Sequence, residues 1–235
     1  MRLPPLVPAT LLKRYKRFLA DCRLDDGSEV TAHVANSGSL LGMTAPGTRI
    51  WISTSEDPAR KLKHSWELVE AHGGLVNVNT ARPNRIAEEA IRDGALPTLA
   101  GYASLRPEVK YGRNSRIDLL LDDPARGRCY VEVKSVTLSR RPGLAEFPDA
   151  VTSRGAKHLD ELIGEVKAGH RAVMLYLVQV PDAKSFSLAN DIDPAYAAAF
   201  VQARANGVEA VAALARVTTQ EIRIIGEIPI AAVTT

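Results

Sequence analysis

The spacing of apolar residues changes near Pro83, and this change constrains the fold more than any other feature of the sequence. Before Pro83, apolar and polar residues alternate over short segments separated by turn residues such as Asp26-Gly27 and Pro46-Gly47, which is typical of β-strands. From Pro83 onward, helical spacing is mixed with short apolar runs. The sequence therefore predicts two units, residues 1–81 and residues 82–235, and each is long enough to bury a core.

The first unit is predicted to be a small β-barrel or sandwich, because several short strands joined by turns favour these architectures. The second unit is predicted to be an α/β domain, which makes the whole chain α+β, and its central strands should be covered on both faces. The expected strands of the first unit are residues 18–24, 30–34, 49–54, 65–69 and 75–80. In the second unit, helices are expected at residues 84–92, 150–168 and 194–205, and strands at 108–111, 117–121, 129–136, 172–180, 208–216 and 221–225.

Three charged residues on two otherwise apolar strands are the clearest chemical feature. Asp118 stands within residues 117–121, and Glu132 and Lys134 share one face of residues 129–136. Buried alone, a carboxylate or ammonium is unfavourable, so these groups need one another or a cation. Carboxylates are suitable ligands for Mg²⁺ or Mn²⁺, and a neighbouring lysine can orient the attacking water or stabilise charge on a phosphate. The pattern predicts a metal-dependent, nuclease-type site with Asp118 and Glu132 as metal ligands and Lys134 as a catalytic residue.

The alternative is a hairpin with one solvated face, on which Asp118 pairs with Arg116. An aspartate followed about a dozen residues later by Glu-x-Lys also arises by chance. The apolar setting of both strands favours the site, since a solvated face would carry more polar neighbours.

Further candidates lie on the helices before and after the two strands. Glu89 lies closer than Glu88 to the apolar face of the helix at residues 84–92, which makes it a candidate third metal ligand and catalytic residue; the alternative is a solvated glutamate. After the strands, three basic residues near the start of a helix are candidates for contacting the scissile phosphate, or else form a solvated face. They are Arg154, Lys157 and His158.

The first unit carries basic residues interleaved with aromatic ones, a combination used by barrels that bind nucleic acid through phosphate contacts and base stacking. The alternative places Phe18 and Trp66 in the core and leaves the basic residues as solubilising charges. The candidate nucleic-acid-binding residues are Lys13, Arg14, Lys16, Arg17, Lys61 and Lys63.

Segments distributed along nearly the whole chain resemble the sugar fermentation stimulation protein A (SfsA) family. They are residues 14–20, 36–38, 64–68, 78–80, 108–112, 115–118, 131–137, 147–151 and 154–159. The resemblance implies an N-terminal OB-like β-barrel followed by a PD-(D/E)xK restriction-endonuclease-like α/β domain. In the pattern of that superfamily, Asp118, Glu132 and Lys134 map onto the acid, acid and lysine.

The resemblance also implies DNA binding without sequence preference and a role in regulating sugar metabolism, with maltose as the expected sugar. Two functions stay open: a DNA-binding protein with a nuclease-type Mg²⁺ or Mn²⁺ site, and an active metal-dependent endonuclease or exonuclease. A small-molecule enzyme is disfavoured, because the sequence offers neither a phosphate-cradling glycine loop nor a nucleophile–base pair.

Composition adds expectations about the surroundings of the protein. The net charge of +3 permits a phosphate-rich partner without requiring one. The longest apolar run, residues 172–178, is too short to span a bilayer, and residues 1–8 do not match a signal peptide. We therefore expect a cytoplasmic protein with no membrane contact, reduced cysteines, and an oligomeric state that the sequence leaves open, a homodimer included.

Overall fold

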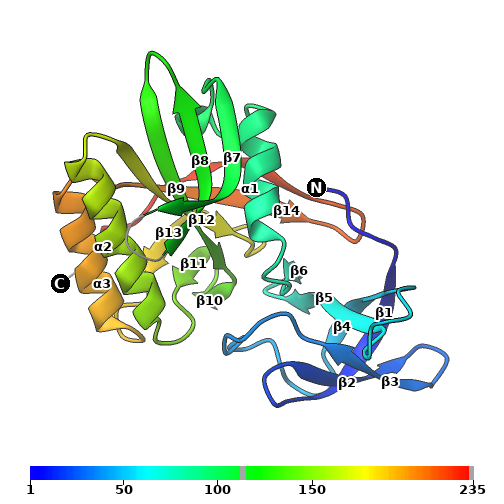
Figure 1. Cartoon of the computed structure of the whole chain (residues 1–235). Helices are drawn as coiled ribbons and strands as arrows, with labels where there is room; N and C mark the ends of the chain where they lie inside the picture. Colours follow the sequence, from blue (N-terminus) through cyan, green and yellow to red (C-terminus); the bar gives the residue numbers. More distant parts are fainter. Residues whose placement is uncertain (112–114, 233–235) are drawn as a thin grey trace.

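The computed structural model describes residues 1–111 and 115–232. Gly112, the last residue of the 108–112 motif, lies outside them. Figure 1 shows an N-terminal barrel and a larger domain in which helices lie on the faces of a central sheet. Within the described residues, no helix is long and apolar enough to cross a membrane.

The barrel closes through a parallel pairing of β3 with β5, so that the strands follow each other around it in the order β1-β2-β3-β5-β4 and back to β1. This arrangement confirms the predicted OB-like fold. Trp66 is fully buried in the barrel core, as one of the two alternatives required. The strands are β1 (Leu6–Tyr15), β2 (Leu19–Leu24), β3 (Glu29–His33), β4 (Arg49–Thr54), β5 (His64–Ala71) and the additional β6 (Gly74–Asn77).

Strand β1, which pairs with both β2 and β4, was not predicted from the sequence. Its pairing with β2 shifts by one residue between Leu11 and Lys13, which is the mark of a β-bulge. A bulge interrupts the alternation of apolar and polar residues, and Pro8 further obscures it. Strand β1 therefore lacks the period-two pattern by which the other barrel strands were found.

The second domain is built on a six-stranded sheet in the order β15-β14-β12-β9-β8-β7. Helix α1 covers one face of the sheet, and α2 and α3 cover the other. A separate apolar core fills the space on each face. The elements are α1 (Pro83–Arg92), β7 (Ser104–Tyr111), β8 (Ser115–Asp123), β9 (Gly127–Val136), α2 (Ser153–Lys167), β12 (Arg171–Val178), α3 (Pro194–Ala205), β14 (Glu209–Val217) and β15 (Ile222–Ile228).

Strands β9, β12 and β14 run parallel to each other at the centre of this sheet. A parallel strand covered by helices on both faces is apolar along its whole length, which explains the run at residues 172–178. A small second sheet was missed, because its strands are only four residues long; it contains β10 (Leu138–Arg141), β11 (Leu144–Phe147) and β13 (Ser185–Leu188).

Polar contacts, among them the following, join the barrel to the second domain. The Asp149 carboxylate accepts a hydrogen bond of 3.0 Å from the Leu40 backbone N–H and another from the Ser39 hydroxyl. Where the chain passes from the barrel into the second domain, Arg82 forms an ion pair of 2.7 Å with Glu67, whose side chain is almost fully buried. The Arg82–Glu67 pair is largely buried, and truncating one partner of such a pair leaves an uncompensated charge, so this ion pair constrains how the two units meet.

Candidate functional site

Strands β8 and β9 separate within the central sheet, and two acidic side chains lie where they part. Their antiparallel pairing ends at Leu119–Val131, and Asp118 and Glu132 are the next residues on the two strands. Beyond this point β8 pairs only with β7, and β9 only with β12. The Asp118 carboxylate accepts a hydrogen bond of 2.7 Å from the backbone N–H of Val133, which stabilises the opening. The strand separation therefore brings the two predicted acids together.

Glu132 is held through only one of its two carboxylate oxygens. The Lys134 ammonium donates a hydrogen bond of 2.8 Å to Oε1, and the Nδ1 of His158 contacts the same oxygen. The other oxygen, Oε2, is buried with the side chain, of which only 3% is exposed, and it has no hydrogen-bond partner among the described residues. A buried carboxylate oxygen without a partner is unfavourable, so this atom indicates a missing ligand.

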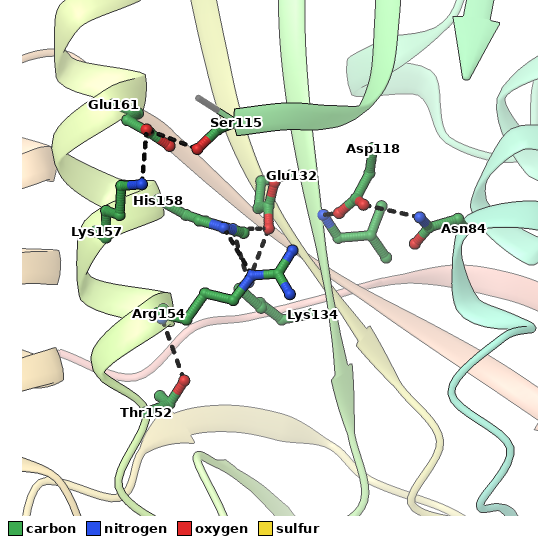
Figure 2. Close-up of polar contacts among 12 residues, drawn as sticks. Asn84, Ser115, Asp118, Glu132, Lys134, Thr152, Arg154, Lys157, His158 and Glu161 are labelled. Carbon is green, nitrogen blue, oxygen red and sulfur yellow. Dashed lines mark hydrogen bonds and ion pairs between the residues drawn. The ribbon is translucent and has the colours of Figure 1, made fainter. Parts of the chain in front are cut away.

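His158 is a buried neighbour of Glu132, and its predicted contact with the scissile phosphate stays a prediction. It lies on α2, which begins after the helix cap Thr152, and it is 6% exposed. The Arg154 Nε–H donates to His158 Nε2 at 3.2 Å, so we assign the ring proton to Nδ1, which faces Glu132. The His158 ring is buried, whereas Arg154 is exposed. Figure 2 shows the Arg154 guanidinium next to the His158 ring.

The pKa values of the two carboxylates are shifted in opposite directions. Burial raises the pKa of Asp118 to about 6, and the nearby Glu132 carboxylate adds to the rise. Burial alone would also raise the pKa of Glu132, but the hydrogen bond from His158 and the charge of Lys134 outweigh it and hold this pKa below its ordinary value. Near neutral pH both groups are therefore ionised, and the ionised form is less favourable for Asp118 than for Glu132.

Replacing Asp118 by Asn should stabilise the protein in the absence of metal. The unfolded chain releases the Asp118 proton near its ordinary pKa of 3.8, whereas the folded chain keeps it until about pH 6. The folded state binds more protons between these values, so stability falls as pH rises through this window. Above pH 6, Asp118→Asn should be more stable than the wild type by up to about 3 kcal/mol, and below pH 4 the two should match.

Urea unfolding in EDTA at several pH values measures this difference. Asp160→Asn, which alters an exposed aspartate on α2, is the matched control and should keep the wild-type pH profile. If the free energy of unfolding depended on pH in the same way for the wild type and for Asp118→Asn, the raised pKa of Asp118 would be contradicted.

Glu89, the predicted third acid, lies away from Asp118. Its carboxylate forms ion pairs of 2.8 Å with the Met1 ammonium group and 3.0 Å with Arg85. Asn84 occupies the helix face that looks toward the site and donates a hydrogen bond of 2.8 Å to Asp118. Asn84 and Glu89 lie on different sides of α1, because five residues correspond to about 1.4 helical turns. We therefore leave Glu89 out of the proposed metal ligands.

Some basic residues of the barrel make contacts within the barrel, and others lie where they can contact a ligand. Arg14 donates hydrogen bonds to the backbone carbonyls of Arg17, Asn36, Gly38 and Ser39, so it holds two loops together. Lys13 lies 3.6 Å from the Asp21 carboxylate. By contrast, Lys16 and Arg17 lie at the tip of the β1–β2 hairpin, with positive φ angles of 48° and 63°. This left-handed turn also directs Phe18 outward, where it is 47% exposed, contrary to the core alternative.

A groove of 800 Å³ runs from this hairpin tip to the beginning of α2. Lys16 and Arg17 line its barrel side, and Val151 and Thr152 line its other side, just before Arg154 on the chain. The groove therefore connects the basic hairpin of the barrel with the helix that contacts Glu132.

The other predicted nucleic-acid contacts are spread over the surface. Lys61 and Lys63 lie in the loop between β4 and β5, and the Lys63 ammonium donates to the Asp57 carbonyl at 2.7 Å. Lys157 is exposed on α2 and lies 3.6 Å from the Glu161 carboxylate. Exposed lysines with a single weak partner remain free to contact phosphates at little cost.

The donor set suits a hard divalent cation. Asp118 and Glu132 supply carboxylate oxygens, one of them the partnerless Oε2 of Glu132. Among residues 1–111 and 115–232, no group of three or more His, Cys, Asp or Glu is placed to hold a metal ion, so the two carboxylates alone would supply the protein ligands of these types. An open position with two carboxylates and several waters is the arrangement that Mg²⁺ prefers, since it dehydrates reluctantly.

Sequence reasoning missed Asn84 and Glu108. Asn84 was expected only as the first residue of a helix. Glu108 was expected in a short strand and in one of the segments that resemble the SfsA family, but neither residue carries a spacing relation to Asp118 or Glu132 in the sequence. The positive φ of Glu108, 55°, has no sequence signal either.

Two family models together match most of the chain. The SfsA N-terminal OB domain matches residues 12–78, and the sugar fermentation stimulation protein RE domain matches residues 81–221. A sugar fermentation stimulation protein homolog of Rhodospirillum centenum is 65% identical over 211 residues, which are 89% of this chain and 91% of the relative. A homolog of Brucella anthropi is 60% identical over 226 residues, which are 96% and 97% of the two chains.

One solved structure has the same fold over almost the whole chain. It is Pyrococcus furiosus SfsA in complex with Ca²⁺, with a TM-score of 0.88, 27% sequence identity, and coverage of 99% of this chain and 98% of that one.

Proposed function

The chain belongs to the sugar fermentation stimulation protein (SfsA) family, and from this premise we propose that it binds DNA without sequence preference and holds Mg²⁺ or Mn²⁺ between Asp118 and Glu132. We propose that DNA binding is how it influences sugar metabolism, maltose use included. Phosphodiester hydrolysis at the same site is the second candidate function.

The observation that carries the metal proposal is Oε2 of Glu132, which is buried beside Asp118 and has no hydrogen-bond partner in the described part of the chain. Lys134 and His158 hold the opposite oxygen, so the free oxygen keeps a fixed direction. The Ca²⁺ in the Pyrococcus furiosus relative supports a divalent cation, since Ca²⁺, Mg²⁺ and Mn²⁺ share a preference for oxygen ligands.

The groove between the barrel and α2 supports the DNA proposal. Lys16 and Arg17 project into solvent from a strained turn, and such strain persists where the surrounding structure maintains it for a function. Phe18 stands beside them with an exposed ring that can stack on a base. A DNA strand that enters at the hairpin and follows the groove would reach Arg154, whose guanidinium lies next to His158 and close to Glu132.

Lys134 is the observation that favours hydrolysis as the second function. Its ammonium lies on the same strand face as Glu132, 2.8 Å from Oε1, where it can orient a water molecule or a phosphate oxygen. When bound, Mg²⁺ or Mn²⁺ would polarise the phosphate and acidify the attacking water. Arg154 would then neutralise part of the phosphate charge, because its remaining N–H groups face solvent.

Incubating the purified chain with supercoiled, linear and single-stranded DNA in Mg²⁺, Mn²⁺ or EDTA tests both functions. Retention of unrelated DNA sequences in EDTA supports binding, and metal-dependent nicking supports hydrolysis. A strong preference for one operator sequence in competition would contradict non-specific binding.

Removing the hairpin charges should weaken DNA binding for every sequence alike. Lys16→Ala combined with Arg17→Ala removes two phosphate contacts, so the slope of log affinity against log salt should become shallower by about two. Fluorescence anisotropy at several salt concentrations measures the slope. Arg23→Ala is the matched control, because it removes a barrel charge that is paired with Glu29 and lies outside the groove. Equal slopes for wild type and the double variant would remove the hairpin from the DNA interface.

A further inference from the structure

Exposed apolar side chains lie at the groove between the β1–β2 hairpin and the beginning of α2. Val151 lines the groove and is 75% exposed. Phe18 is exposed directly after the groove-lining Arg17, and Leu41 is exposed in the loop 37–44, which supplies further lining residues. Single exposed apolar residues are ordinary on a protein surface, but several gathered at one hollow mark a binding surface.

Two aromatic rings form part of the groove wall itself. They belong to Tyr15 and Phe147, which are both half-buried. The Tyr15 hydroxyl donates a hydrogen bond of 3.0 Å to Asp21, and the Lys13 ammonium lies 5.2 Å from the centre of the Tyr15 ring. Phe147 packs edge to face against Tyr196, with ring centres 5.2 Å apart. Both rings are thus held in place before a ligand arrives, which lowers the entropy lost on binding.

The groove also carries positive charge. Lys16 and Arg17 are exposed on its barrel side. Among the described residues that line the groove, Asp149 is the only acidic one, and its carboxylate already accepts hydrogen bonds from the Ser39 hydroxyl and the Leu40 backbone N–H. The basic side chains therefore suit a phosphate and the apolar walls suit a flat ring, which are the two parts of a nucleotide.

Unpaired bases can use such walls, whereas paired bases cannot. In a duplex the bases stack on one another and present only their edges to a protein. In a single strand each base exposes a face, and stacking on an aromatic side chain strengthens binding whatever the base is. The groove volume of 800 Å³ is in the range of pockets that hold one small ligand, so the groove can enclose separate bases but not a base-paired stack.

We propose that this groove binds single-stranded DNA, with a base stacked on Phe18 and phosphates at Lys16 and Arg17. The inference rests on the proposed function, because it names the form of DNA that the chain binds. Stacking tolerates any sequence, so it agrees with binding without sequence preference. The groove ends just before Arg154 on the chain, and an unpaired strand that leaves it there meets the helix that contacts Glu132.

The test is fluorescence anisotropy of the full chain in EDTA with three probes of equal length: an oligothymidylate, an abasic single strand and a duplex. The salt concentration is kept constant, because phosphate contacts depend on it. The wild type should bind the oligothymidylate at least about 10-fold more tightly than either of the other probes, since a stacked base contributes about this factor.

Phe18→Ala should weaken oligothymidylate binding by about 10-fold and leave the affinities for the abasic strand and the duplex unchanged. Phe18→Trp should keep the wild-type affinities, because tryptophan also offers a ring on which a base can stack. Phe18→Leu should behave like Phe18→Ala, because leucine is apolar but has no ring. Circular dichroism checks that each variant is folded.

Val151→Glu is a second variant, which places a negative charge in the groove wall. It should lower the oligothymidylate affinity by about 5-fold or more, because the new carboxylate repels phosphates a few ångström away. Ile225→Glu is the matched control. It adds the same charge at an exposed apolar position of β15 outside the groove, so it should keep the wild-type affinity.

The outcomes separate this inference from the proposed function. If the duplex or the abasic strand is bound as tightly as the oligothymidylate, the single-strand groove is overturned and DNA binding stays. The same holds if Phe18→Ala changes the three affinities equally or not at all. If the wild type binds none of the three probes, both the groove and the proposed DNA binding are overturned.

Discussion

Lys134→Ala is expected to lower the rate of metal-dependent plasmid nicking by about 10²–10³-fold, the loss typical of removing one transition-state contact. The Lys134 ammonium lies 2.8 Å from Glu132 and is 15% exposed, so it acts beside the acids and contributes little to the outer basic surface. DNA affinity in EDTA should therefore stay at the wild-type value. Lys134→Arg should not restore the rate, because a planar guanidinium cannot take the place of a compact ammonium in a nearly buried position.

The measurement is a nicking time course under Mn²⁺ with wild type, Lys134→Ala and Glu132→Ala. Lys167→Ala, at the exposed end of α2, is the matched control and should nick at the wild-type rate. Equal nicking by wild type, Lys134→Ala and Glu132→Ala would assign the activity to a contaminating nuclease. Absence of nicking by the wild type would contradict the hydrolytic function and leave DNA binding as the proposed one.

His158→Ala is expected to weaken Mn²⁺ binding by about 10–100-fold, the usual cost of losing a group that orients a metal ligand. His158 contacts Oε1 of Glu132 and is itself fixed by Arg154, so it keeps Oε2 directed at the cation position. Without the ring, Glu132 loses one of its two partners, and its carboxylate gains alternative rotamers. DNA affinity in EDTA should not change, since the ring is buried.

His158→Gln provides the rescue, because its amide N–H can donate to Glu132 in place of Nδ1–H. Calorimetry with Mn²⁺ should place it between the wild type and His158→Ala. The reverse result, with DNA affinity reduced and Mn²⁺ affinity unchanged, would support the predicted phosphate contact of His158 and would contradict its role in orienting Glu132.

Much of the fold could be predicted from local patterns. The change of periodicity at Pro83 separates the barrel strands from the α/β domain because strands and helices bury one face with different periods. The apolar run at residues 172–178 likewise marks a central parallel strand, since only burial on both faces tolerates such a run. Strand β1 escaped prediction where its bulge broke the period, and β10, β11 and β13 were too short to show one.

The candidate site divides in the same way. The sequence by itself determined that Asp118, Glu132 and Lys134 interrupt apolar strands, because a charge in such a strand is unfavourable unless something compensates it. It could not determine which neighbours compensate it, since those come from other elements. Only the tertiary structure decided that Glu89 turns to the Met1 ammonium, that His158 supports Glu132, and that Asn84 joins Glu108 to Asp118. These contacts depend on the separation of β8 from β9 and on the left-handed residue in β7, and neither leaves a periodic trace in the sequence.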